Sequence, residues 1–267
     1  MNKALLVGIN NYPNCPLRGC VNDVTDMANL LVTGFGFKPE EIRLLTDARA
    51  TTDAIIERLT WLADAKPGDK VFFHYSGHGA QYPARNDKSE IDGKYEIICP
   101  VDFDWSPRRM ITDKQFVNIF KRMPSGVKFN WFSDSCHSGD LDRNMTPKMK
   151  KGTIINGMRR YPVPADIAWR QYVAKEKKII IEDRGLVNGT LEVGFVSGCR
   201  SDQTSADAAF GGKANGALTY FLIKHLSSNK SLPLNAIVPK VIGDMKNYGF
   251  TQVPTCAGTR GSISFLG

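Results

Sequence analysis

Several patterns that would assign this chain to a class at once are missing. No two of its six cysteines form a C-x-x-C pair, and its four histidines lack the short paired spacings of structural zinc sites. A disulfide framework, a zinc cluster and a dithiol redox site are therefore not expected. The sequence also contains no internal repeat and no low-complexity tract.

Long hydrophobic runs are missing as well. The first apolar run, residues 1–9, is too short to span a membrane, and no signal-peptide cleavage pattern follows it. We expect a chain that starts at this methionine, resides in the reducing cytoplasm with free thiols, and has no membrane partner.

An acidic balance is absent too, since the net charge is +8. Between Arg143 and Arg184 there are 11 Lys or Arg and 4 Asp or Glu, a net charge of +7 in one segment. This basic segment is consistent with a solvated loop, a self-cleavage region or an anion-binding surface. A nucleic-acid-binding protein would show salt-sensitive binding that this segment carries, but the local origin of the charge argues against nucleic acid as a partner.

Short apolar runs alternate with amphipathic, helix-length segments, which is typical of α/β proteins with a mostly parallel sheet. The basic segment is predicted to be largely irregular, with one helix over 165–173, and the parts on either side of it to share one sheet. The expected strands are 3–9, 43–46, 71–75, 127–133, 191–197 and 262–266, and the expected helices are 22–31, 52–65, 113–123, 215–227 and 233–246.

Two of the expected strands run into glycine-flanked polar loops. One ends in S-G-H-G at 76–79 and the other in D-S-C-H-S-G at 134–139. Ligands of open parallel sheets bind at the carboxyl ends of strands, so His78 and Cys136 are candidates for one site if these strands are neighbours. A cysteine with a distant histidine indicates a nucleophile, with backbone N–H groups available for an oxyanion.

Four motifs in order resemble those of metacaspases and their prokaryotic caspase-like relatives. They are L-R-G-C-V-N-D at 17–23, Y-S-G-H-G at 75–79, D-S-C-H-S-G at 134–139 and S-G-C-R-S-D-Q-T-S-A-D at 197–207. The resemblance implies one caspase-like catalytic domain over 1–267, built as a three-layer α/β/α sandwich. It would comprise a large-subunit-like region (1–142), a basic linker (143–190) and a small-subunit-like region (191–267). True caspases match less well, because their Q-A-C-x-G is D-S-C-H-S-G here.

The same resemblance implies a role for each motif residue in a cysteine endopeptidase. Cys136 would be the nucleophile and His78 the general acid and base, with the N–H groups of Gly79 and Cys136 forming the oxyanion hole. A pocket with two carboxylates favours a cation, so cleavage after Arg or Lys is expected, in protein or peptide substrates. The pocket residues would be Cys20, Asp23, Ser76 and Asp134. Asp202 and Asp207 are either further substrate contacts or solvated loop acids.

The basic linker offers sites for such an enzyme to cut itself. Our hypothesis is that the linker is processed or lies over the site as a latch. A catalytically silent interaction domain is the alternative function, although such a domain has no need for both His78 and Cys136. The resemblance favours a monomer. The candidate self-cleavage residues are Lys148, Lys150, Lys151, Arg159 and Arg160.

Calcium is the one metal that the resemblance suggests. The chemistry itself requires no cofactor, but many metacaspases bind calcium through aspartates near the two catalytic motifs. Asp92, Asp113 and Asp142 lie in comparable places, and hard oxygen ligands suit calcium. One aspartate of the family's pair is replaced by Thr112 before Asp113, and Asp142 requires a one-residue shift.

Overall fold

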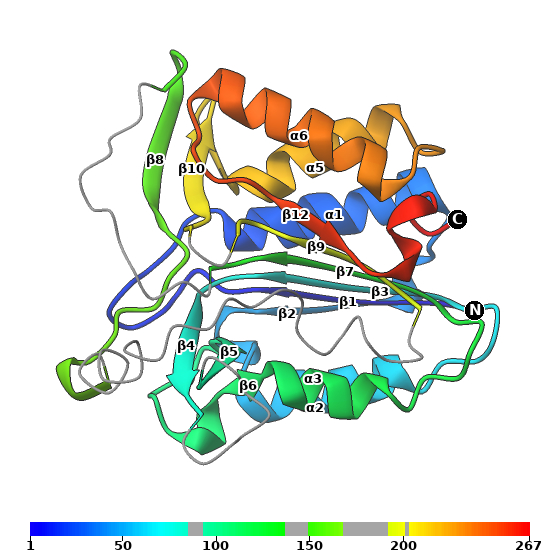
Figure 1. Cartoon of the computed structure of the whole chain (residues 1–267), viewed down its shortest axis with the longest axis horizontal. Helices are drawn as coiled ribbons and strands as arrows, with labels where there is room; N and C mark the ends of the chain where they lie inside the picture. Colours follow the sequence, from blue (N-terminus) through cyan, green and yellow to red (C-terminus); the bar gives the residue numbers. More distant parts are fainter. Residues whose placement is uncertain (85–92, 137–148, 168–191, 201–202) are drawn as a thin grey trace.

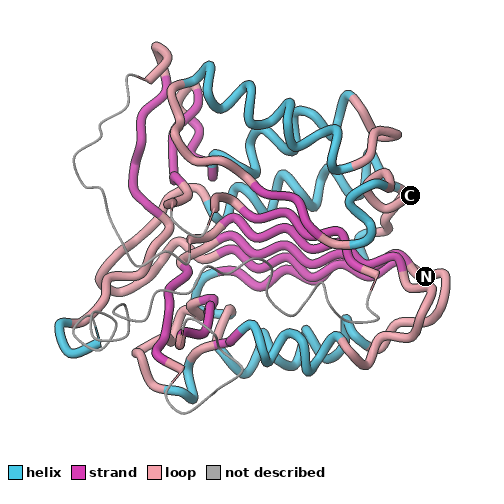
Figure 2. Tube along the Cα trace, in the orientation of Figure 1, coloured by secondary structure: helices cyan, strands magenta, loops and turns pink. Residues whose placement is uncertain are grey.

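The computed structural model describes residues 1–84, 93–136, 149–167, 192–200 and 203–267. Within these ranges, helices lie on both faces of a central sheet, so that the chain forms three layers (Figure 1). The trace in Figure 2 shows the strands of this sheet side by side between the helical layers. This is the α/β/α sandwich that the sequence predicts.

The central sheet has six strands in the order β12-β9-β7-β3-β1-β2. All neighbours are parallel except β12, which runs antiparallel to β9. The two strands β9 and β12 come from the C-terminal part of the chain, so both parts share the sheet, as predicted. The strands are β1 (Asn2–Gly8), β2 (Ile42–Thr46), β3 (Lys70–Ser76), β7 (Lys128–Asp134), β9 (Val193–Ser197) and β12 (Thr255–Ala257).

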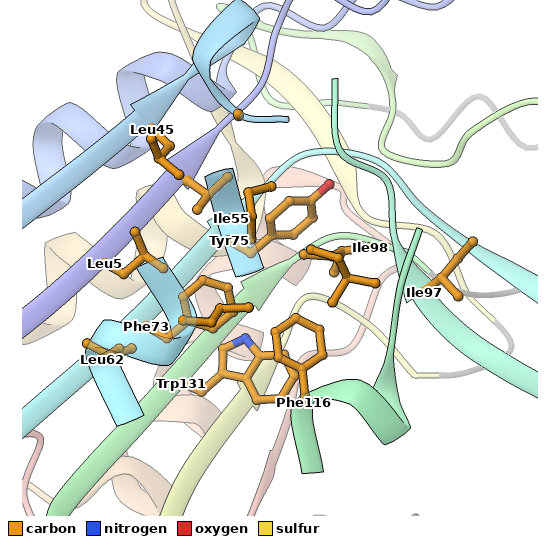
Figure 3. Close-up of a cluster of buried hydrophobic side chains, with 14 of the residues drawn as sticks. Leu5, Leu45, Ile55, Leu62, Phe73, Tyr75, Ile97, Ile98, Phe116 and Trp131 are labelled. Atoms are coloured by element: carbon orange, nitrogen blue, oxygen red, sulfur yellow. The ribbon is translucent and has the colours of Figure 1, made fainter. Parts of the chain in front are cut away.

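Alternate side chains of the buried strands pack against different helices. Helices α2 (Thr52–Ala63) and α3 (Asp113–Phe120) cover one face of the sheet. On this face Phe73 packs with residues of both helices, including Ile55 and Phe116 (Figure 3). The opposite face, which includes Phe72, is covered by α1 (Cys20–Phe35), α5 (Ala217–Ser228) and α6 (Leu234–Tyr248). Each fully buried large apolar side chain contributes roughly 1.5–3 kcal/mol, so the two cores hold the layers together.

Local sequence signals set the ends of several helices. Thr51 caps α2 by accepting the N–H of Ala54. Thr112 and Gln115 form a reciprocal capping box at the start of α3. Helix α1 ends at Gly36, whose φ of 73° is a left-handed conformation that glycine adopts without strain.

Two small antiparallel sheets accompany the central one (Figure 1). The first has the order β4-β5-β6, and the second has the order β11-β10-β8. Strand β4 begins three residues after β3 ends, which places the first small sheet next to the carboxyl ends of the central strands. The strands are β4 (Gly79–Pro83), β5 (Lys94–Ile98), β6 (Ile111–Thr112), β8 (Thr153–Met158), β10 (Ala206–Phe210) and β11 (Lys213–Gly216).

The described residues differ from the sequence predictions at two strands. The basic segment was predicted to be largely irregular, and its described part contains β8, which pairs with β10 about fifty residues later in the chain. The predicted helix over 165–173 is described only for 165–167, which are helical. The expected strand at 262–266 is also absent from the described residues. Its alternating pattern reflects burial of Phe265 against Phe72 and Phe132, and the last strand is instead β12.

None of the helices within the described ranges combines the length and hydropathy that a membrane span needs.

Candidate active site

The two strands that carry the predicted catalytic motifs are direct neighbours. Strand β3 pairs with β7 in parallel, with Ser76 opposite Asp134. The loops that hold His78 and Cys136 therefore leave the same edge of the sheet at the same level. Both side chains are buried. The sequence predicted one site for His78 and Cys136 if their strands were neighbours, and the strands are neighbours.

The His78 ring is fixed by its surroundings. Its Nε2 lies 2.7 Å from the carbonyl oxygen of Cys15, so Nε2 carries the proton and Nδ1 has the lone pair. Burial lowers the pKa of His78 to about 4, which leaves the imidazole neutral at pH 7. Nδ1 is buried and has no hydrogen-bond partner among the described residues. It is therefore the nitrogen that can accept a proton.

The Cys136 thiol lies against the main chain of Ser205. Sγ accepts the N–H of Ser205 and lies 3.5 Å from its carbonyl oxygen. The thiol of Cys199 is close by, and its contact with Cys136, together with burial, raises the pKa of Cys199.

Two backbone N–H groups converge on one peptide carbonyl of the chain itself. The carbonyl oxygen of Arg159 accepts the N–H of Gly79 at 3.1 Å and the N–H of Cys136 at 3.2 Å. These are the two N–H groups that the sequence predicted for an oxyanion hole. A carbonyl held by two fixed donors is polarised toward the charge that develops during nucleophilic attack.

The guanidinium of Arg159 lies in a fully buried pocket of carboxylates. Burial alone lowers its pKa, but the surrounding acids outweigh this and raise it, so the group stays charged. The predicted pocket residues Asp23, Ser76 and Asp134 all contact it. Nη2 lies 2.7 Å from Asp23 and 3.0 Å from Asp207, and Nη1 lies 2.6 Å from Ser76 Oγ and 3.5 Å from the Asp134 carboxylate.

Cys20, the fourth predicted pocket residue, is also buried here. Burial raises the pKa of its thiol, and the charge of Arg159 acts in the opposite direction. This thiol therefore stays protonated at neutral pH and lines the pocket as a small uncharged side chain.

Each carboxylate of the pocket is held by hydrogen bonds from different elements. Asp134 accepts from Ser205 Oγ and from the N–H and hydroxyl of Thr219 at the start of α5. Asp23 accepts from the Gly216 N–H, and a Cβ at position 216 would overlap with both Asp134 and the Arg159 guanidinium. Fixed hydrogen bonds of this kind keep the acids oriented in the absence of a cation.

Asp207 is the pocket residue that the sequence left undecided. It accepts the N–H groups of Arg18 and Gly19, both at 2.9 Å, and its side chain is buried next to Arg159. The reading as a solvated loop acid is therefore wrong for Asp207, which lies on β10. Asp202 lies outside the described residues.

The segment around Arg159 crosses the site in extended form. Before Arg159, β8 pairs with β10, and the Arg159 N–H donates to Ser205 at 2.9 Å. After it, the Tyr161 N–H donates to the Gly79 carbonyl at 3.1 Å. Main-chain pairing on both sides of one carbonyl is how extended peptides are bound by strand addition.

The predicted calcium ligands are mostly outside the described residues. This applies to Asp92 and Asp142, whereas Asp113 lies in the first turn of α3, where its carboxylate accepts the N–H of Lys114. In the part of the chain that the structure describes, no group of three His, Cys, Asp or Glu side chains is arranged to hold a metal. Calcium binding stays a prediction from the sequence.

The buried histidines lead us to expect that stability falls as the pH is lowered from 6 to 5. Burial lowers the pKa of both His74 and His78 to about 4, so each takes up a proton when the chain unfolds in this range. Asp23 acts oppositely, because burial raises its pKa to about 6 and unfolding releases its proton. A net uptake of one proton lowers the free energy of unfolding by roughly 1.4 kcal/mol per pH unit.

Denaturant titrations of the Cys136→Ala protein at both pH values measure this effect. A His74→Asn variant on the same background should show a shallower dependence, and equal stabilities at pH 6 and pH 5 would contradict the expectation.

Comparisons with known proteins show the family of the chain. The family model described as "Metacaspase, peptidase C14 domain" matches residues 2–143. Metacaspase-1 of Schizosaccharomyces pombe is 33% identical over 94% of this chain and 66% of its own length. Metacaspase-1A of Aspergillus oryzae is 33% identical over 98% of this chain and 69% of its own. The chain thus spans about two thirds of the length of these relatives.

Solved structures agree on the fold. A protein from Geobacter sulfurreducens, 25% identical, superposes with a TM-score of 0.67 over 96% of this chain and 92% of its own. Caspase-1 from Spodoptera frugiperda, 11% identical, has a TM-score of 0.62 over 100% of this chain and 89% of its own, a similarity of fold alone. With the family model covering more than half of the chain, the protein belongs to the metacaspases, a family of peptidase C14 cysteine peptidases with the caspase-like fold.

Proposed function

We propose that this metacaspase is an endopeptidase that cleaves after arginine and, more slowly, after lysine. The observation that carries the proposal is the placement of Arg159. Its side chain occupies the carboxylate pocket while its carbonyl oxygen accepts the N–H groups of Gly79 and Cys136. An arginine of a substrate bound in the same way would present the peptide bond that follows it to the Cys136 thiol.

In the proposed reaction, the thiol proton of Cys136 passes to Nδ1 of His78 as Sγ bonds to the carbonyl carbon. The negative charge on the oxygen is stabilised by the two N–H groups. The C–N bond then breaks, and the departing amine takes the proton from Nδ1. Water hydrolyses the thioester, which releases the new carboxyl group and returns a proton to Sγ.

The preference for arginine follows from the geometry of the pocket. A planar guanidinium reaches acids on two sides with separate N–H groups, which the single ammonium of lysine does less well. An aspartate before the bond would place a fourth negative charge among Asp23, Asp134 and Asp207. We therefore propose that it is rejected.

We also propose that the chain cuts itself between Arg159 and Arg160. Arg159 is one of the linker residues that the sequence identified for self-processing. Lys150, by contrast, packs over the Tyr248 ring on α6, and Lys151 is exposed. Lys148 lies outside the described residues. Among the described candidates, Arg159 has both its side chain in the pocket and its carbonyl on the two N–H groups.

Fluorogenic peptides with Arg, Lys or Asp before an aminocoumarin test the activity. We expect kcat/KM to fall about tenfold from Arg to Lys and turnover to be lost with Asp. Cys136→Ala and His78→Asn should each reduce turnover of the Arg peptide about 10³-fold or more. His225→Asn, a change at a histidine that pairs with Asp244 on the α5–α6 layer, is the matched control.

A preference for Asp would contradict the assigned pocket. If the purified wild-type chain fails to turn over the Arg peptide under all conditions, including added calcium, the catalytically silent interaction domain becomes the better assignment.

A further inference from the structure

The chain beyond the proposed cleavage point enters a second pocket, which is aromatic. Tyr161, two residues after Arg159, is buried to 8% exposure even though its neighbour Pro162 is exposed. Its ring contacts four others, at centroid distances of 5.8 Å to Tyr12, 5.7 Å to His78, 4.9 Å to Phe103 and 6.3 Å to Trp105. All four contacts are edge-to-face, an arrangement that aromatic pairs favour.

The walls of this aromatic pocket are held by contacts that do not involve Tyr161. The Tyr12 hydroxyl donates to the Cys99 carbonyl at 2.8 Å and accepts the N–H of His78 at 3.0 Å. Phe103 packs on Trp105, with their centroids 5.0 Å apart, and is itself buried. The pocket is therefore part of the frame that positions His78.

Main-chain contacts fix the position of whichever residue enters this pocket. The Gly79 N–H binds the carbonyl of Arg159, and the Gly79 carbonyl accepts the N–H of Tyr161. One residue thus holds the chain on both sides of the Arg159–Arg160 bond. Because both contacts use backbone atoms, any extended peptide with arginine in the acidic pocket would place its second following residue among the same rings.

We infer that this cluster of Tyr12, His78, Phe103 and Trp105 is a substrate pocket for an aromatic side chain two residues after the cleaved bond. The inference rests on the proposed function. It narrows the substrate class from proteins with an arginine to segments of the form Arg-X-Tyr or Arg-X-Phe. The Tyr161 hydroxyl makes one 3.3 Å hydrogen bond to the Phe103 carbonyl, so tyrosine and phenylalanine should be accepted almost equally.

Internally quenched peptides built on residues 155–163 test this inference. Alanine replaces the residue equivalent to Arg160, so that each peptide contains a single arginine. The position equivalent to Tyr161 is Tyr, Phe, Ala or Asp, and mass spectrometry identifies the cleaved bond. With the full-length wild-type chain, we expect kcat/KM for Tyr and Phe to exceed that for Ala by about tenfold or more.

Two variants locate the effect. Trp105→Ala should reduce the ratio of Tyr-peptide to Ala-peptide turnover, because it removes one wall of the pocket. Trp105 is only half-buried, so the fold should tolerate its replacement. Trp61→Ala, at a tryptophan on α2 that packs with Arg43, should leave the ratio unchanged. A high ratio that survives Trp105→Ala would overturn the assignment to this pocket.

A coumarin substrate that ends in Gly-Met-Arg separates this inference from the proposed function, because it has no residue to enter the aromatic pocket. If it is turned over while the Tyr and Ala peptides are cleaved equally, the aromatic pocket is overturned and the arginine-directed activity stands. If it is not turned over, both fail together.

Discussion

The Arg159→Ala protein should remain intact, whereas the wild-type chain should separate into a fragment that ends at Arg159 and one that starts at Arg160. Alanine cannot contact the three carboxylates that now surround the guanidinium. Removing one partner of a buried ion pair costs about 3–5 kcal/mol, which corresponds to a rate reduction of at least about 100-fold. A time course of intact-mass spectra after purification measures the rate of self-cleavage.

Two further proteins control this experiment. Lys151→Ala changes an exposed basic residue of the same segment and should be cut like the wild type. Cys136→Ala should not be cut at all. Self-cleavage is excluded if Cys136→Ala gives the same fragments as the wild type, and the role of Arg159 is excluded if Arg159→Ala is cut at the wild-type rate.

Asp207→Asn should lower kcat/KM for an arginine peptide by about 100-fold. Its carboxylate lies 3.0 Å from Nη2 of Arg159 and is buried, so solvent does not screen the interaction. Replacing it by an amide removes the charge and keeps the size, although the single amide oxygen can replace only one of the two carboxylate oxygens that accept the N–H groups of Arg18 and Gly19. Neutralising one partner of such a buried charge pair typically costs several kcal/mol of interaction free energy.

The nearby Asp26 provides a matched control for Asp207. It lies on α1 one turn after Asp23, but pairs with the exposed Lys213. Surface pairs contribute little, so Asp26→Asn should stay within about twofold of the wild type. Equal activities of Asp207→Asn and Asp26→Asn would show that Asp207 has no part in recognising the cation.

The central strands and most helices could be predicted because their signals are local. Residues 71–75 are apolar except for His74, and the structure places β3 there, between β1 and β7. Strand β8 gave no such signal. Ile154 is 65% exposed, Gly157 adds no side chain to the pattern, and the pairing partner β10 lies far along the chain. A strand stabilised mainly by remote main-chain pairing leaves little pattern in its own residues.

The acidic pocket was predicted in part for a similar reason. Asp23, Ser76 and Asp134 were assigned to the pocket from motifs. Asp207 also ends a motif, but its role was left open, because it sits in a short alanine-rich strand where burial of an acid has no local sequence signature. Likewise, Arg159 was one of several basic residues of the linker. Arg159 differs from the other basic residues in its position, because it follows β8 directly and lies at the carboxyl ends of β3 and β7.

The Asp134-Ser-Cys136 spacing places an acid close to a nucleophilic thiol, which would disfavour a thiolate if both faced the same solvent. In the fold, the Asp134 carboxylate is directed to Thr219, Ser205 and the Arg159 guanidinium. The Cys136 thiol faces the Ser205 main chain. The carboxylate and the thiol therefore contact different partners, and the carboxylate lies against the Arg159 cation.

The occupied pocket also has a kinetic consequence for foreign substrates. Arg159 is attached to the enzyme, and a ligand tethered by a short connection behaves as if it were present at a millimolar effective concentration. A free peptide at micromolar concentration competes poorly with it when the two have similar affinity for the three carboxylates. Under the proposed function, Arg159 of the uncut chain acts as a competitive inhibitor, and the affinity of the site for peptides in solution depends on how readily β8 separates from β10.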